Sequence, residues 1–327
     1  MKKLLFLIIP ILLIGCETNP PTTPINSIVE YGNIKVISNV DDAKIFLDGT
    51  DSGKLTPDTL RASVGNHTIE LRKDGYEISA SNVNVLKNTE VHVIFNLFAS
   101  NKVVLVEDFS NVACNPCVIS NKIIEQLVYR TFGTTKLVAI KYPTNFPSGV
   151  DPFYLANPAD CNARMFYYSI ITAPNTIIDG TIEPIPSDSN DIKEKIYSEL
   201  VKIPKFIINV DHNILGSNYN INISVEVKDM SSLDFSKLVL HTVVTETNIE
   251  FVTPPGANGE TKFYDVMRKM LPSNQGESLS TINQVGTYNF LRQVTLNSGW
   301  VPDNINTVVF IQNKDTKEIY QAGSTFK

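Results

Sequence analysis

The sequence predicts a multidomain protein of mixed fold class: a small all-β module, then an α/β domain, then a C-terminal β-sandwich. Residues 32–98 alternate apolar and polar side chains between glycine-containing turns, which is typical of short half-buried strands. Residues 99–200 alternate strand-like and helix-like runs, and residues 201–327 are rich in strand patterns. A length of 327 residues allows two or three domains.

Residues 1–16 predict that the chain leaves the cytosol. After the basic start Met1-Lys2-Lys3, the run from Leu4 to Ile14 is apolar except for Pro10, and it is too short to cross a bilayer as a stable helix. It ends in Leu13-Ile14-Gly15-Cys16, which resembles a bacterial lipobox. The resemblance implies cleavage before Cys16 and a lipid on the new N-terminal cysteine. The alternative is an ordinary signal peptide with an incidental cysteine.

The residues after Cys16 indicate an envelope location. Glu17 stands where an aspartate would signal retention in the inner membrane, which favours the outer membrane. Residues 17–31 contain the run Asn-Pro-Pro-Thr-Thr-Pro and no apolar periodicity, so they predict an extended linker. A net charge of -6 argues against a nucleic-acid partner. The expected partner is therefore the membrane, through the N-terminal lipid.

The first module has the alternation of a small β fold. Ile34 and Val36 flank Lys35 on the opposite face, and residues 67–72 and 90–97 alternate in the same way. The pieces Ala43-Lys44-Ile45-Phe46-Leu47-Asp48-Gly49, Thr56-Pro57, Val64-Gly65-Asn66-His67-Thr68-Ile69 and Lys73-Asp74-Gly75-Tyr76 resemble a PEGA domain. The resemblance implies a surface module for spacing or binding, without a catalytic group.

The motif with the clearest chemistry is Cys114-Asn115-Pro116-Cys117. It stands where an apolar strand, residues 102–109, gives way to a helical run, residues 118–130. Free N–H groups and the helix dipole favour a thiolate at Cys114, and Cys117 lies one turn away, within disulfide reach. Pro116 suits a first helical turn, where its missing N–H costs nothing. Outside the cytosol such a pair can stay oxidised.

The elements that follow extend this pattern. A buried-strand run at residues 136–142 precedes a helical run at 159–169 and a strand at 172–180 that Pro174 introduces. The order resembles the thioredoxin fold, which implies a cis bond at Ala173-Pro174 beside the cysteine pair. It also implies that Asp108, six residues before Cys114, is a buried carboxylate that handles protons.

The C-terminal segment predicts strands with one short helix. The strand patterns are Ile208-Asn209-Val210, residues 221–227, residues 238–247 and residues 307–312, and the helical piece is residues 263–271. The stretches Phe263 to Pro272, Val309-Phe310-Ile311-Gln312 and Tyr320-Gln321-Ala322 look like the outer-membrane lipoprotein family called Omp-twenty-eight. That resemblance covers residues 101–327 and concerns fold and location more than activity.

The cysteines leave two interpretations open. Cys114 and Cys117 form either a working redox pair or a structural disulfide. In the first case the Cys114 thiolate attacks a substrate disulfide, Cys117 resolves the mixed disulfide and Asp108 relays the proton. Pro174 would then shape the substrate groove. Cys161 is expected in the core, although it could resolve a bond with Cys114 or pair between molecules.

No metal and no cofactor are expected. Three cysteines would need a fourth zinc ligand, and the four histidines lie outside the segment with the cysteines. The acidic loop at residues 187–191 reads as a polar turn before a helix at 192–200, with Ser189 or Asn190 as its cap.

Two functions follow. The first is a lipid-anchored envelope protein that exchanges disulfides with envelope proteins, with Cys114, Cys117, Asp108 and Pro174 as the site. The second is a non-enzymatic surface lipoprotein that binds a partner, in which the cysteine pair only stabilises the start of a helix.

Overall fold

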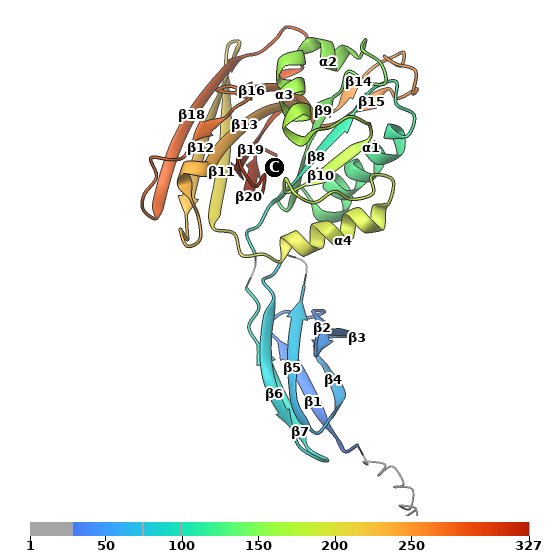
Figure 1. The fold of residues 1–327 in the computed structure, drawn as a ribbon, viewed down its shortest axis with the longest axis vertical. Coiled ribbons are helices and arrows are strands. Elements are labelled where there is room, and N and C mark those ends of the chain that lie inside the picture. Colours follow the sequence, from blue (N-terminus) through green and yellow to red (C-terminus); the bar gives the residue numbers. More distant parts are fainter. Residues whose placement is uncertain (1–28, 74, 99, 327) are drawn as a thin grey trace, which may run out of the picture.

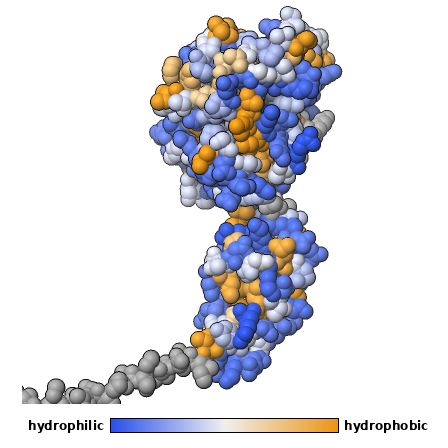
Figure 2. All heavy atoms as spheres, turned by 90° about the vertical axis from the view of Figure 1, so that its right-hand side faces the viewer, coloured by the Kyte–Doolittle hydropathy of each residue, from blue (hydrophilic) through white to orange (hydrophobic). Residues whose placement is uncertain are grey.

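A computed structural model describes residues 29–73, 75–98 and 100–326. Figure 1 shows a narrow N-terminal part below a larger part that holds all labelled helices. The lipobox, Cys16 and most of the linker lie outside the described residues. None of the helices in the described ranges is long and apolar enough to cross a membrane. The face in Figure 2 is mostly hydrophilic, with an apolar band down the middle of the larger part.

The N-terminal part consists of two sheets around one core, with strand orders β4-β1-β7 and β3-β2-β5-β6. In β1, Ile34 and Val36 are fully buried, as their alternation predicts, and Ile34 pairs with Leu60 and Val91 on the two neighbouring strands. The strands are β1 (Tyr31–Ser38), β2 (Lys44–Leu47), β3 (Thr50–Leu55), β4 (Asp58–Ser63), β5 (Gly65–Arg72), β6 (Ser79–Val85) and β7 (Glu90–Phe95).

The middle segment places a buried strand at its centre. Its elements are β8 (Val104–Ser110), α1 (Cys117–Gln126), β9 (Leu137–Pro143), α2 (Pro152–Ala156), α3 (Pro158–Tyr168), β10 (Asn175–Ile178) and α4 (Ser189–Leu200). β8 runs parallel to β9 and antiparallel to β10. Helices α1 and α4 pack on one face, where Ile124 and Ile192 meet Val106, and α3 packs on the other. Burial on both faces explains the apolar run at residues 104–106, and it also buries Glu107 and Asp108, which follow in the same strand.

Two helix ends differ from the prediction. After α1 the chain continues as a turn of π-helix, Leu127–Phe132. Helix α4 begins at Ser189, and its cap is Asp188 rather than Ser189 or Asn190. The Asp188 backbone is still extended, so its carboxylate can turn back and accept from the N–H groups of Asn190 and Asp191, at 2.9 and 3.1 Å.

The predicted helix at residues 263–271 is wrong, because this segment is extended. Its apolar pairs, 266–267 and 270–271, have a spacing that also fits a helix. In the structure β16 pairs with β9 and β13, and both apolar pairs are buried, with Met267 and Met270 in one core and Leu271 in another. The C-terminal strands are β11 (Phe206–Leu215), β12 (Asn218–Val227), β13 (Leu238–Glu246), β14 (Ile249–Glu250), β15 (Lys262–Phe263), β16 (Val266–Leu271), β17 (Glu277–Ser278), β18 (Gly286–Thr295), β19 (Ile305–Asn313) and β20 (Ile319–Ser324).

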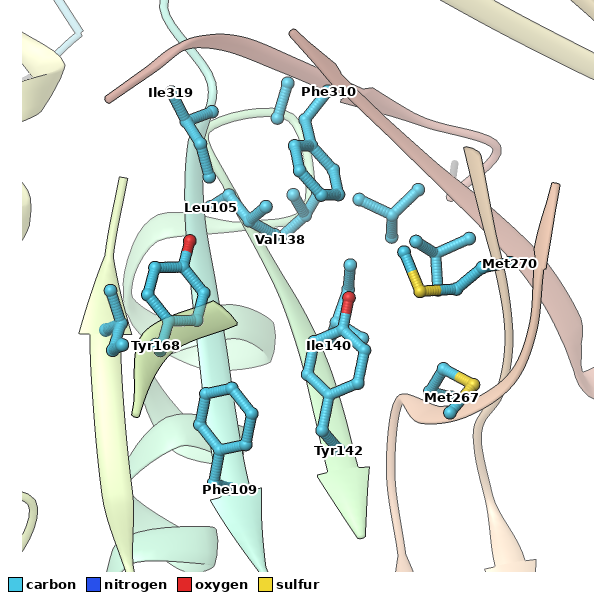
Figure 3. Close-up of a cluster of buried hydrophobic side chains, with 14 of the residues drawn as sticks. Leu105, Phe109, Val138, Ile140, Tyr142, Tyr168, Met267, Met270, Phe310 and Ile319 are labelled. Carbon is cyan, nitrogen blue, oxygen red and sulfur yellow. The ribbon is translucent and has the colours of Figure 1, made fainter. Parts of the chain in front are cut away.

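One sheet runs through the middle and C-terminal segments. In the described ranges its order is β10-β8-β9-β16-β13-β19-β20, with β17 also paired to β13. Figure 3 shows one core of this sheet: Leu105 and Ile140 of β8 and β9 face Phe310 of β19 and Met270 of β16. A second core lies between β13 and β19 and the separate sheet β11-β12-β18. The cysteine motif is therefore carried by a strand whose core includes C-terminal residues.

Candidate functional site

Cys114 and Cys117 form a disulfide at the start of α1. The S–S distance is 2.06 Å and the Cα atoms are 5.3 Å apart. Pro116 is the N-cap residue and Cys117 the first helical residue, so the motif joins β8 to α1 as predicted. Cys114 is slightly more exposed than Cys117, at 3% against 0%. Both cysteines are buried.

A C-terminal loop packs directly on the loop that carries Cys114. We call residues 252–260, between β14 and β15, the cover loop. The Asn258 N–H donates to the Val112 carbonyl at 3.0 Å, and the Asn258 side-chain amide lies 3.5 Å from the carbonyl oxygens of Asn111 and Cys114. A Cβ atom at Gly256 would lie 2.3 Å from the Val112 carbonyl oxygen, so only glycine allows this approach.

Asp108 lies within β8 and is 1% exposed. The Lys141 ammonium donates to its Oδ2 at 3.0 Å. The hydroxyl groups of Ser120 and Thr176 donate to its Oδ1 at 3.4 and 3.2 Å. A cation thus compensates the carboxylate, and both of its oxygens are occupied. The burial of Asp108 agrees with the prediction, whereas a role in proton transfer remains a prediction.

Pro174 lies at the start of β10. Its peptide bond with Ala173 is cis, as the sequence predicted. Asn175 pairs with Phe109 near the end of β8. Pro174 therefore lies beside the point where the chain leaves β8 toward the cysteines. Pro174 is half-buried. The structure therefore brings Cys114, Cys117, Asp108 and Pro174 to the same end of β8, while Cys16 lies outside the described residues.

A chain of polar side chains links Asp108 to the cover loop. The Lys141 ammonium also donates to the Asn121 side-chain carbonyl. The Asn121 amide donates to both carboxylate oxygens of Glu260 at 2.9 Å, and the Asn258 amide donates to Glu260 at 2.7 Å. Sequence reasoning missed Lys141, Asn121, Asn258 and Glu260. A lone lysine within the apolar run of β9 was the one available signal.

A cavity of about 350 Å³ lies beside this chain, between α1 and residues 258–265. Asp108, Lys141 and Glu260 are among its lining residues, and Asp265 lies at its inner wall. Burial raises the pKa of Asp265 to about 6, although the Tyr129 hydroxyl donates to it at 2.5 Å. Asp265 can therefore bind or release a proton near neutral pH.

Cys161 takes no part in this site. It lies in α3, is fully buried and forms no disulfide, as the core prediction required. Burial raises the pKa of its thiol far above the ordinary value. A thiol in this environment stays protonated and is a poor nucleophile.

Comparison with protein families identifies the N-terminal part. Residues 31–101 match the model of the PEGA domain family. The first module is a PEGA domain. This agrees with the resemblance carried by the sequence motifs between residues 43 and 76. The PEGA domain accounts for less than a quarter of the chain, and no curated protein matched the sequence.

Solved structures resemble the fold. HBP35 of Porphyromonas gingivalis superposes with a TM-score of 0.56 and 14% identity, over 70% of this chain and 76% of that chain. A protein of Agrobacterium tumefaciens gives 0.44 with 13% identity, over 69% and 95% of the two chains. A domain of the outer membrane lipoprotein Omp28 from P. gingivalis gives 0.26 with 19% identity, over 38% and 88%. At these identities the likeness to HBP35 concerns the fold alone.

Proposed function

We propose that this chain is a lipid-anchored protein of the cell envelope, held at the outer membrane by Cys16, whose role is binding rather than catalysis. In this proposal the PEGA domain spaces the larger part from the membrane. The larger part combines a thioredoxin-like unit with a β-sandwich. The Cys114–Cys117 disulfide stabilises the junction between β8 and α1.

The strand arrangement supports a thioredoxin-like unit. β8 and β9 are parallel and joined through α1, while β10 returns antiparallel on the other side of β8. α4 then covers the same face as α1. The cysteine motif at the start of α1 and Pro174 before β10 also support this proposal, because the resemblance expects them beside these elements.

The burial of Cys114 is the observation that carries the structural interpretation. Disulfide exchange needs in-line attack on a sulfur atom, and therefore access. Cys114 is 3% exposed, and the cover loop packs on the backbone beside it. Asp108, the expected proton carrier, is held by Lys141 and two hydroxyl groups. In this conformation little of either cysteine is open to a substrate protein.

Disulfide exchange is the second candidate, because the motif begins a helix and lies near a buried acid. The oxidised pair would accept electrons from a substrate dithiol. One substrate thiolate attacks Cys114, the S–S bond breaks and Cys117 leaves as a thiolate. The second substrate thiol then displaces Cys114, so the substrate is oxidised and the pair reduced. The cover loop would have to move away first.

The reduction potential of the pair distinguishes the two functions. The full-length protein is equilibrated with dithiothreitol buffers, alkylated, and analysed by mass spectrometry. We expect a potential below about -300 mV, as in structural disulfides, and no mixed disulfides in cells that express Cys117→Ser. A higher potential, together with substrate proteins trapped on Cys114 of Cys117→Ser and absent from Cys114→Ser, would establish exchange instead.

A further inference from the structure

The outer face of the sheet β11-β12-β18 has an unusual composition. Side chains that alternate with its buried residues point away from the core, five on each strand. These fifteen positions, all within the described residues, carry ten amide or hydroxyl side chains and no lysine or arginine. We call this surface the amide face. Its six asparagines are Asn209, Asn213, Asn218, Asn220, Asn222 and Asn289.

Cross-strand hydrogen bonds order part of the amide face. The Asn220 amide donates to the Asn213 carbonyl at 3.0 Å, and the Gln293 amide donates to the Asn220 carbonyl at 2.7 Å. These three side chains form one row across the three strands. Because their rotamers are already restricted, a ligand that binds them costs less side-chain entropy than one that binds free amides.

A hollow of about 310 Å³ lies beside this row. Asp211, Asn222 and Leu291 line it and are register partners on the three strands. Asn289 and Ser224 line it one row further along. Leu291 is 73% exposed, so the hollow offers an apolar surface among hydrogen-bonding groups.

The charge of the amide face decides between classes of ligand. None of its fifteen positions carries a cation that could hold a phosphate, a nucleic acid or an acidic polymer, and Lys228, just beyond β12, is paired with Glu226. The two acids of the amide face are Asp211 and Glu226, and the row formed by Asn209 and Ser224 lies between them. A neutral ligand with many hydroxyl groups is complementary to this charge. Its hydroxyls both donate and accept, as side-chain amides do.

We propose that the amide face binds a neutral glycan, with a sugar ring in the hollow. The ring hydroxyls bond to Asn222, Asn289 and Asp211, and its C–H face packs on Leu291. The neighbouring units of the glycan follow the row of Asn213, Asn220 and Gln293. This inference rests on the proposed binding role and supplies the ligand class for it.

Binding to immobilised polysaccharides tests the inference. The full-length protein, in a zwitterionic detergent without a sugar headgroup, is measured by interferometry on dextran, β-glucan, mannan and galactan surfaces. Polygalacturonate serves as an acidic comparison. We expect binding to at least one neutral surface and none to polygalacturonate. Asn222→Lys and Asn289→Lys should each weaken binding by about tenfold, since each loses hydrogen bonds and adds bulk at the hollow.

Asn84→Lys is the matched control, because Asn84 is also an exposed asparagine on a strand, in the PEGA domain. It should bind as the unchanged protein does, and circular dichroism should show that all variants fold. Absence of binding to every neutral surface would overturn the inference. So would binding that Asn84→Lys and Asn222→Lys weaken equally.

A second copy of the chain could cover the same face instead. Light scattering would then show a dimer that Asn222→Lys dissociates, without glycan binding, and this too would overturn the inference. The glycan measurement is independent of the reduction potential. A high reduction potential together with glycan binding would contradict only the structural role of the disulfide. A low reduction potential without glycan binding would contradict only the glycan as ligand.

Discussion

At the scale of residues, two buried carboxyl groups hold protons unusually well. Burial raises the pKa of Asp179 to about 6 despite the Lys102 ammonium 2.7 Å away, and it raises the pKa of Asp265 to about 6 as well. Neither acid is among the site residues that sequence reasoning selected, where Asp108 was the one carboxyl group. Their burial follows from contacts between the middle and C-terminal segments: Lys102 also bonds to the Tyr320 carbonyl, and Asp265 accepts from Tyr129.

Asp265→Asn should change how stability depends on pH. Since the pKa of Asp265 is higher in the folded chain than its ordinary 3.8, its contribution to stability is full below about pH 4 and lost as the pH rises through 6. The amide cannot ionise, still accepts from Tyr129 and tolerates the positive φ of 55°. Urea unfolding at pH 4.5 and 7.5 should therefore show a smaller loss of stability in the variant, by up to about 2 kcal/mol.

Asp211→Asn, at an exposed position, is the control for this measurement and should keep the pH dependence of the unchanged protein. An identical pH dependence in Asp265→Asn and the unchanged protein would contradict the raised pKa.

At the scale of elements, the cover loop contacts both the loop that carries Cys114 and helix α1. Its base is closed by the pairing of β14 with β15 and by the Phe251 N–H bonding to the Thr261 carbonyl at 2.8 Å. Glu260 holds it to α1 through Asn121, and Gly256 lets it approach Val112. The loop thus limits access to the disulfide through contacts with both the preceding loop and the helix.

Gly256→Ala should make the disulfide easier to reach. The new Cβ would meet the Val112 carbonyl oxygen, so the cover loop has to move outward. We expect reduction by dithiothreitol, followed by alkylation over time, to be about tenfold faster than in the unchanged protein, which corresponds to about 1.4 kcal/mol for opening the loop. Gly149→Ala, whose new Cβ would lie 3.9 Å from the Asn145 carbonyl oxygen, should react at the unchanged rate. Equal rates in all three proteins would show that the loop does not protect the bond.

At the scale of the whole molecule, the middle and C-terminal segments share one interior. Besides the apolar core in Figure 3, the buried Arg164 guanidinium donates to Glu107 at 2.6 Å and to the Gln312 side-chain carbonyl at 3.1 Å. These three residues belong to α3, β8 and β19. Separating the segments would keep the Arg164–Glu107 pair but remove its hydrogen bond to Gln312 and expose the shared apolar core to water, which is costly. The PEGA domain, by contrast, has its own core.

Membrane anchoring is the prediction that concerns the whole chain. Cys16→Ser should release the protein from membranes or leave it uncleaved, because the acyl chains that hold a lipoprotein in the bilayer would be missing. Fractionation of cells and mass measurement of the mature chain check this. Asn19→Ser, in the same linker, should behave as the unchanged protein does. Unaltered processing and membrane association in Cys16→Ser would remove the basis for an envelope anchor.

Local patterns in the sequence determined several features directly. Alternation identified the strands of the PEGA domain, and the cysteine motif was placed correctly between β8 and α1. The cis bond at Ala173-Pro174 was expected from the resemblance to the thioredoxin fold, and the burial of Cys161 from the usual burial of free cysteine. The strands and the cysteine motif depend on residues close together in the chain, so the sequence alone can predict them.

Only the tertiary structure decided which distant segments meet. β16 resembled a helix because its buried residues come in pairs and do not alternate. β18 was missed because the outward Leu291 and the inward Arg292 interrupt its alternation. Neither the cover loop on Cys114 nor the Lys141–Asn121–Glu260 chain has a local signal, since about 140 residues separate Asn121 from Glu260. The sequence by itself therefore determined where a disulfide forms, and the packing of the C-terminal segment decided that it is buried.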